Sequence, residues 1–181
     1  MLLESKKIEL GTPVVEFALK GVDGKIYTPS SFEGASALVV VVTCNHCPYA
    51  KASWPLLIRL QAAFKEEGVQ FVAVNPNDDE AYPEDSFDRM KENAKELALN
   101  FPYLRDDTQS VARNLGAVCT PDIYVYDSSH KLYYHGRIND NWQDQNKVRE
   151  QNLKDAIERL LHGDASPLKQ PPSIGCSIKW K

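Results

Sequence analysis

The sequence has no long apolar run and no excess of positive charge. Its most apolar stretch, centred on the valines at 39–42, is far shorter than the ~20 residues that cross a bilayer. The 21 Lys and Arg against 25 Asp and Glu give a net charge of −4, which exerts no general attraction on nucleic acid. The first residues also lack the apolar core of a secretory signal. We therefore expect a cytoplasmic protein without membrane or nucleic-acid partners.

Cysteine is scarce as well. Four cysteines in 181 residues are too few for a fold held together by disulfides. Two of them, Cys44 and Cys47, form a Cys-x-x-Cys pair, and no second such pair exists to complete a zinc site. In a reducing compartment this spacing favours redox chemistry without a bound cofactor or metal. A non-catalytic module that binds a metal or a partner protein is an alternative.

The apolar pattern predicts one α/β domain, a three-layer α/β/α sandwich with a mixed central sheet. Ala37–Val42 and Val69–Val74 are continuous apolar runs, which are typical of strands buried on both faces. Further strands are expected near 15–19, 26–27, 101–104, 123–126 and 132–135, and helices over 48–67, 87–97, 111–115 and 148–161. We place the domain at 1–162 and expect 163–181 to be an irregular, proline-rich tail.

The cysteine pair follows a buried strand and precedes a helix. The free N–H groups and the dipole at a helix N-terminus stabilise a thiolate, so we expect the pKa of Cys44 to lie below ~8.5. His46, when protonated, would strengthen this effect. Cys47 is close enough to resolve a mixed disulfide. These residues predict thiol-disulfide exchange.

Thr120-Pro121 directly precedes an apolar strand and is a candidate for a cis peptide bond. If this loop lies opposite the cysteine pair, the backbone of Thr120 could pair with an extended substrate peptide. Cys119 is either a buried apolar side chain or a third redox thiol. Cys176 could fold back to Cys44 or Cys119, pair between subunits, or pack as a structural thiol under Trp180.

Two other groups of residues receive simpler interpretations. The acidic side chains between 78 and 85 are expected to be solvated loop and helix-start charges. Trp142 and Arg137 either line a substrate groove or pack at the edge of the core.

Several motifs together resemble the thioredoxin superfamily. They are Leu10-Gly-x-Pro13, Asp23-Gly-Lys25, Cys44-x-x-Cys47 and Leu115-Gly-Ala-x-x-Thr120-Pro121. Within the superfamily they resemble the branch of peroxiredoxins and TlpA- and ResA-like reductases, over roughly residues 9–162. The resemblance implies a thioredoxin-like fold with an N-terminal β-hairpin extension. It also implies that Cys44 attacks, Cys47 resolves and Pro121 is the cis-proline. A histidine before the second cysteine is similar to the more oxidising protein disulfide isomerase and DsbA.

The sequence departs from peroxiredoxins and from thioredoxin at positions that bear on activity. The peroxidatic signature Pro-x-x-x-Thr-x-x-Cys is absent, because Cys44 and Val40 stand at its Thr and Pro places when counted back from Cys47. Thr120 replaces the peroxide-activating arginine, and Leu38 replaces the buried acid of thioredoxin.

We therefore predict a thiol-disulfide oxidoreductase, with a peroxiredoxin-like thiol peroxidase as an alternative. Its substrates would be disulfides and thiols of proteins or small molecules. Its reductant would be a dithiol such as a thioredoxin or a reductase, and the protein would be a monomer or homodimer.

Overall fold

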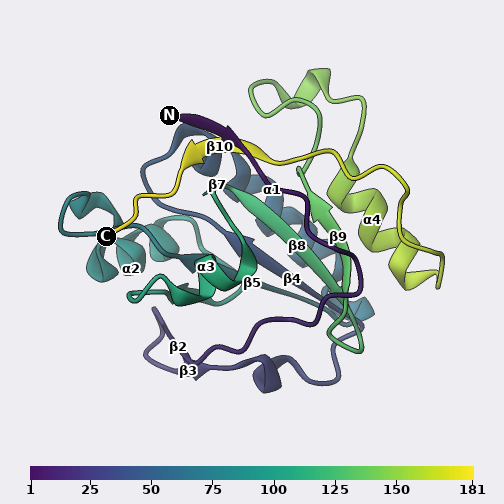
Figure 1. The fold of residues 1–181 in the computed structure, drawn as a ribbon, viewed down its shortest axis with the longest axis horizontal. Helices are drawn as coiled ribbons and strands as arrows, with labels where there is room; N and C mark the ends of the chain where they lie inside the picture. The colour runs from purple at the N-terminus through teal and green to yellow at the C-terminus, as the bar shows by residue number, and fades with distance from the viewer.

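The computed structural model describes all residues, Met1–Lys181, around a seven-stranded sheet (Figure 1). The strand order is β3-β2-β6-β5-β4-β8-β9. The strands are β2 (Leu19–Gly21), β3 (Ile26–Tyr27), β4 (Ala37–Val42), β5 (Val69–Asn75), β6 (Tyr103–Arg105), β8 (Asp122–Asp127) and β9 (Leu132–Gly136). β5 pairs in parallel with β4 and β6, and the other pairs are antiparallel. The predicted mixed sheet and the β2–β3 hairpin are confirmed.

β4 is the central strand and is buried on both faces, as its run of valines predicts. Val39 and Val41 point into one core, while Val40 and Val42 point into the other. The first core is completed by helices α1 (Pro48–Phe64), α2 (Phe87–Glu96) and α4 (Asn152–Leu161). The second is completed by α3 (Ser110–Leu115) and a 3₁₀ turn at Pro29–Phe32. The three-layer sandwich is confirmed.

The C-terminal tail contains a strand where we expected only irregular chain. β10 (Ile174–Ser177) runs between β1 (Leu2–Glu4) and β7 (Cys119–Thr120), antiparallel to both. Figure 1 shows the yellow β10 beside the purple β1, near the N-terminus. Ile174, Cys176 and Ile178 alternate with Gly175 and Ser177, a pattern typical of a strand that we missed within the proline-rich tail. The tail past 162 thus returns to the body of the domain.

Two elements begin later than predicted. β2 starts at Leu19 because the chain before it bonds elsewhere: the Val14 N–H donates to His130 O at 2.9 Å. α4 starts at Asn152 because Asp140 Oδ1 accepts the N–H groups of Arg149 and Glu150, at 2.9 and 3.1 Å. In both cases the apolar pattern in the sequence extends beyond the residues that form regular strand or helix hydrogen bonds.

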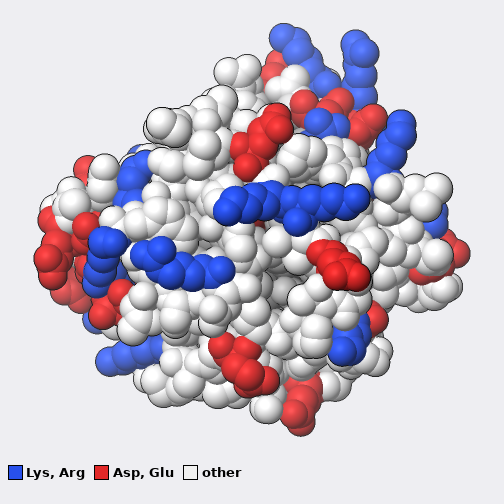
Figure 2. Space-filling model, viewed as in Figure 1, with Lys and Arg blue, Asp and Glu red and all other residues white.

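The surface mixes both signs of charge. Figure 2 shows Lys and Arg interspersed with Asp and Glu on this face, with acidic side chains gathered at its left edge beside α2. The face in view thus carries no broad patch of one sign. None of the helices has the length and apolar character needed to cross a membrane.

Candidate active site

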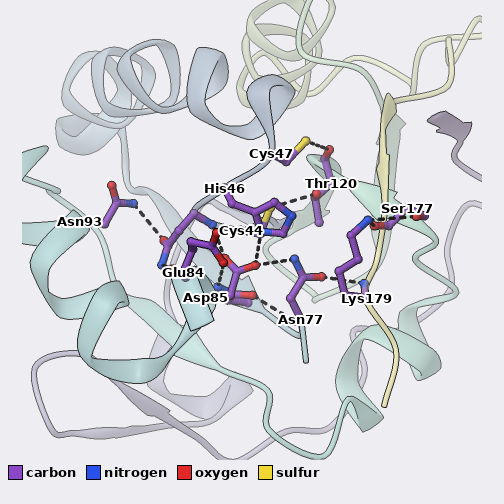
Figure 3. A network of polar contacts seen from close by, with 12 residues as sticks. Cys44, His46, Cys47, Asn77, Glu84, Asp85, Asn93, Thr120, Ser177 and Lys179 are labelled. Atoms are coloured by element: carbon purple, nitrogen blue, oxygen red, sulfur yellow. Dashed lines mark hydrogen bonds and ion pairs between the residues drawn. The ribbon is translucent and has the colours of Figure 1, made fainter. Parts of the chain in front are cut away.

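The two cysteines lie where the central strand gives way to a helix. β4 ends at Val42, and Cys47 is the N-cap residue of α1. Cys44 lies between these elements, next to Thr120 (Figure 3). The predicted strand–cysteine–helix arrangement is present, and α1 begins as predicted at Pro48, four residues after Cys44. Cys47, and not Cys44, therefore takes the position at the helix N-terminus.

Thr120 brings the two predicted segments together. The Thr120–Pro121 peptide bond is cis, as predicted. The Thr120 hydroxyl Oγ1 lies 3.3 Å from Cys44 Sγ, and the Thr120 carbonyl oxygen lies 3.3 Å from Cys47 Sγ, whose neutral thiol form can donate to it. A single residue thus contacts both thiols, one through its side chain and the other through its backbone.

The pKa values of the two thiols are shifted in opposite directions. A hydrogen bond with Cys47, burial and the nearby Asp85 carboxylate raise the pKa of Cys44 well above its ordinary value. The hydrogen bond with Cys44 lowers the pKa of Cys47 to about 4, and Cys176 and the Ala50 backbone N–H act in the same direction. Our expectation of a depressed Cys44 pKa is wrong, because the hydrogen bond between the two thiols favours the thiolate at Cys47 and not at Cys44.

Asp85 is a component of the site that sequence reasoning missed. Its side chain is completely buried. Oδ1 accepts the Asn45 N–H at 2.6 Å and the Asn75 amide at 3.2 Å. Oδ2 shares a 2.5 Å hydrogen bond with His46 Nδ1 and accepts the Asn77 amide at 2.8 Å. These donors compensate the desolvation of the carboxylate. We expected the acids between 78 and 85 to be solvated, but Asp85 points inward.

The two residues between the cysteines are fixed by neighbouring elements. His46 stacks on Tyr82, with ring centroids 5.4 Å apart. The Asn45 Oδ1 accepts the Tyr103 hydroxyl at 2.9 Å and the Asn93 amide at 3.1 Å. Figure 3 shows this polar network, which lies on the side of the cysteines away from α1. The cysteine loop is therefore held in one conformation by β6, α2 and the loop before α2.

Cys44, His46 and Asp85 offer potential ligand atoms within 4.8 Å of one another. However, donors from four residues already engage the two carboxylate oxygens of Asp85. Structural zinc sites use four protein ligands in a tetrahedron, and only three groups converge here. The geometry fits a hydrogen-bond network better than a cation site.

The two remaining cysteines differ in their access to the site. Cys119 is fully buried, and burial raises its pKa. Cys176 on β10 is partly exposed and packs against the cluster of Cys44, Cys47 and Ala50, and burial is the main cause that raises its pKa to about 11. The Arg113 guanidinium lies over the Trp180 ring, 4.3 Å from its centroid. Cys176 thus folds back to the two active-site cysteines, and the predicted return toward Cys44 is one of the alternatives that the sequence left open.

A groove opens beside Pro121. Tyr49 at the start of α1 lines it together with Trp142, and their ring centroids lie 4.0 Å apart. Arg137 also lies along this groove. The structure therefore places both Trp142 and Arg137 in a groove next to the cysteine site, one of the two positions that the sequence suggested.

Comparison with solved structures shows two proteins that are similar over almost the whole chain. An uncharacterized conserved protein from Geobacillus kaustophilus is 43% identical, with a TM-score of 0.95 over 100% of this chain and 97% of that one. A hypothetical protein from Sinorhizobium meliloti 1021 is 36% identical, with a TM-score of 0.94 over 98% of each chain. No curated protein matches the sequence.

More distant structures identify the fold. The thioredoxin domain of a thiol-disulfide oxidoreductase from Bacteroides vulgatus is 16% identical, with a TM-score of 0.68 over 86% of this chain and 99% of that one. The predicted thioredoxin-like fold is therefore confirmed. Residues 10–135, more than half of the chain, match the AhpC/TSA family. This chain belongs to the AhpC/TSA family.

Proposed function

We propose that this protein catalyses thiol-disulfide exchange, with Cys47 as the attacking thiolate and Cys44 as the resolving thiol. The position of Cys47 at the N-cap of α1 carries the proposal, and of the two thiols only this one has a lowered pKa, of about 4. Disulfide exchange begins with a thiolate, and at neutral pH this site supplies one at Cys47. The roles that the resemblance implied for the two cysteines are thereby exchanged.

The exchange proceeds in two steps. The Cys47 thiolate attacks one sulfur of an external disulfide, a mixed disulfide forms, and the other sulfur leaves as a thiolate. Cys44 then gives up its proton and attacks Cys47 Sγ. The Cys44–Cys47 disulfide closes, and the second half of the external disulfide leaves with the electron pair. An external dithiol, such as a thioredoxin, returns the pair to its reduced state.

The second step requires a proton acceptor, because the pKa of Cys44 is raised. The buried Asp85 carboxylate holds the Nδ1 side of the His46 ring, while 23% of the His46 side chain is exposed. A histidine held in this way can take a proton at its other nitrogen and release it to solvent. Asp85 acts here through His46 as a positioning residue.

Disulfides and thiols of proteins or small molecules are the proposed substrates. The Thr120 carbonyl lies next to Cys47, but β10 already pairs with this backbone edge, so an extended peptide can pair there only when β10 moves away. The groove lined by Pro121, Tyr49 and Trp142 lies alongside and offers apolar contacts for substrate side chains.

Reduction of a protein disulfide by a small dithiol donor tests the proposal. Cys47→Ser should fall to the uncatalysed rate, and Cys44→Ser should lose at least about tenfold and accumulate a mixed disulfide. Cys119→Ala, which removes a buried thiol outside the exchange, should keep the parental rate. A Cys47→Ser variant as active as the parent would refute the proposal.

Reduction of hydroperoxides by the same thiolate is the second candidate, and the AhpC/TSA family match favours it. Against the usual mechanism, no arginine is among the groups that lower the pKa of Cys47. Hydroperoxide consumption with a thiol donor separates the two activities. Consumption that exceeds disulfide reduction and disappears in Cys47→Ser would favour the peroxidase.

A further inference from the structure

The C-terminal strand β10 lies where an added peptide strand would pair with Thr120. Cys176 stands opposite Thr120 and Ser177 opposite Cys119 in an antiparallel register. The Ile178 N–H extends this pairing by donating to Val118 O at 3.0 Å. Figure 3 shows Ser177 and Lys179 on this strand, beside Thr120. The edge that a substrate strand would use is therefore occupied by the chain itself.

Gly175 allows β10 to approach this closely. A Cβ atom at position 175 would lie 2.6 Å from the Thr120 carbonyl carbon and 3.2 Å from Pro121 N, and it would overlap the Thr120 oxygen. Backbone atoms cannot move aside as the end of a flexible side chain can. Any side chain at this position would push β10 away from the active site.

Of the three thiols Cys44, Cys47 and Cys176, only that of Cys176 is open to solvent. Cys44 and Cys47 are both 0% exposed. Cys176 is partly exposed and packs against the cluster that Cys44 and Cys47 form with Ala50. A reagent outside the protein therefore meets Cys176 first while β10 remains in place.

We propose that Cys176 is a second resolving thiol, which forms a disulfide with Cys47 when β10 lies against Thr120, and that external dithiols react at its exposed sulfur. β10 then behaves as a substrate strand built into the chain. This inference rests on the proposed function, because it starts from attack by Cys47.

The steps balance as follows. Cys47 attacks an external disulfide, and one half of it leaves as a thiolate. Cys176 loses its proton to solvent and attacks Cys47 Sγ, and the second half leaves with the electron pair of the broken bond. A thiolate of an external dithiol then attacks Cys176 Sγ and expels Cys47, which leaves readily because its pKa is low.

The second thiol of the external dithiol completes the cycle. It breaks the mixed disulfide at Cys176, which recovers its proton, and the dithiol becomes a disulfide. Two electrons have passed from the dithiol to the external disulfide, and all protein thiols are regenerated.

Stoichiometric oxidised glutathione tests the inference on the full-length Cys44→Ser variant, in which Cys176 is the proposed resolver. Intact-mass and peptide mass spectrometry should find a Cys47–Cys176 disulfide and released glutathione. Adding Cys176→Ala or Gly175→Ala should leave glutathione on Cys47, with release slowed at least about tenfold. Adding Cys119→Ala is the matched control and should change nothing. Circular dichroism verifies that each variant is folded.

Three results would overturn the inference. In the first, glutathione stays on Cys47 in Cys44→Ser for the same time as in the double variant that also lacks Cys176. This result would leave the proposed function standing. A folded Gly175→Ala variant could close the Cys47–Cys176 bond at the parental rate, which would remove the role of β10. Failure of Cys47 to take up glutathione in every variant would instead refute the proposed function as well.

Discussion

Asp85 Oδ2 lies 2.5 Å from His46 Nδ1, although the two residues belong to separate segments of the chain. The carboxylate is completely buried, whereas the imidazole reaches the surface. Leu38 stands where the resemblance to thioredoxin placed a buried acid. Asp85 supplies such an acid from the loop before α2, and its charge acts on Cys44. The site therefore has a buried carboxylate, at a different position in the fold.

Replacing Asp85 with Asn should move the pH dependence of resolution by Cys44. The carboxylate contributes to the raised pKa of Cys44, so its removal should shift the midpoint of the second step to lower pH. The amide would also face N–H donors, at a cost of about 1–3 kcal/mol in the free energy of unfolding. Stopped-flow release of glutathione from Cys47 in a Cys176→Ala background measures the midpoint.

Glu84→Gln is the matched control for this change. Glu84 is the neighbouring exposed acid, and only its backbone oxygen contacts the site, at 2.8 Å from Asn45 Nδ2. The pH midpoint of the second step in Glu84→Gln should equal that of the parent. An unchanged midpoint in Asp85→Asn would show that Asp85 does not act on Cys44.

The stability of the reduced protein should depend on the ionisation of Cys47. Its pKa is about 4 in the folded chain and ~8.5 in the unfolded chain, so the unfolded chain binds the extra proton between these values. The contribution of this pKa difference to the free energy of unfolding is complete above about pH 8.5, shrinks as the pH falls, and is lost near pH 4. The raised pKa of Cys44 acts in the opposite sense and only at higher pH.

Urea unfolding between about pH 5.5 and about pH 8 measures this effect. The free energy of unfolding of the parent should rise with pH more steeply than that of Cys47→Ser. Cys119→Ala should keep the parental slope, because burial raises the pKa of that thiol. Equal slopes in the parent and in Cys47→Ser would contradict the assigned thiolate.

The reduction potential should be higher than that of thioredoxin. A stabilised thiolate favours the reduced state, which makes the disulfide a stronger oxidant. Equilibration of the Cys176→Ala variant with glutathione should place the Cys44–Cys47 pair nearer about −120 to −180 mV than about −270 mV. A value at the thioredoxin end of this scale would mean that Cys47 is not selectively stabilised as a thiolate.

The local features of the site could be predicted from the sequence. The valine run at 39–42 identifies the central strand because its apolar residues are continuous, and the Cys-x-x-Cys spacing marks the chemistry. Thr120-Pro121 indicated the opposing loop because it directly precedes the strand that became β8.

The long-range features could not be predicted in this way. Asp85 lies in a loop rich in acids, and nothing adjacent to it indicates that it is buried. β10 has the alternation of Ile174, Cys176 and Ile178 that is typical of a strand, but β1 and β7 are distant in the sequence, so its pairing could not be predicted. The helix start at Pro48 was predicted correctly, but the sequence does not show how the hydrogen-bond donors are shared between the two thiols, and the thiolate was therefore assigned to Cys44.

Titration of the thiolate ultraviolet absorbance of the reduced protein tests the central claim most directly, because it requires no reagent to reach the buried sulfurs. A thiolate should remain at about pH 6, persist in Cys119→Ala and disappear in Cys47→Ser. Thiolate absorbance that appears only above about pH 8, or that survives in Cys47→Ser, would contradict the assignment of Cys47 as the attacking thiolate.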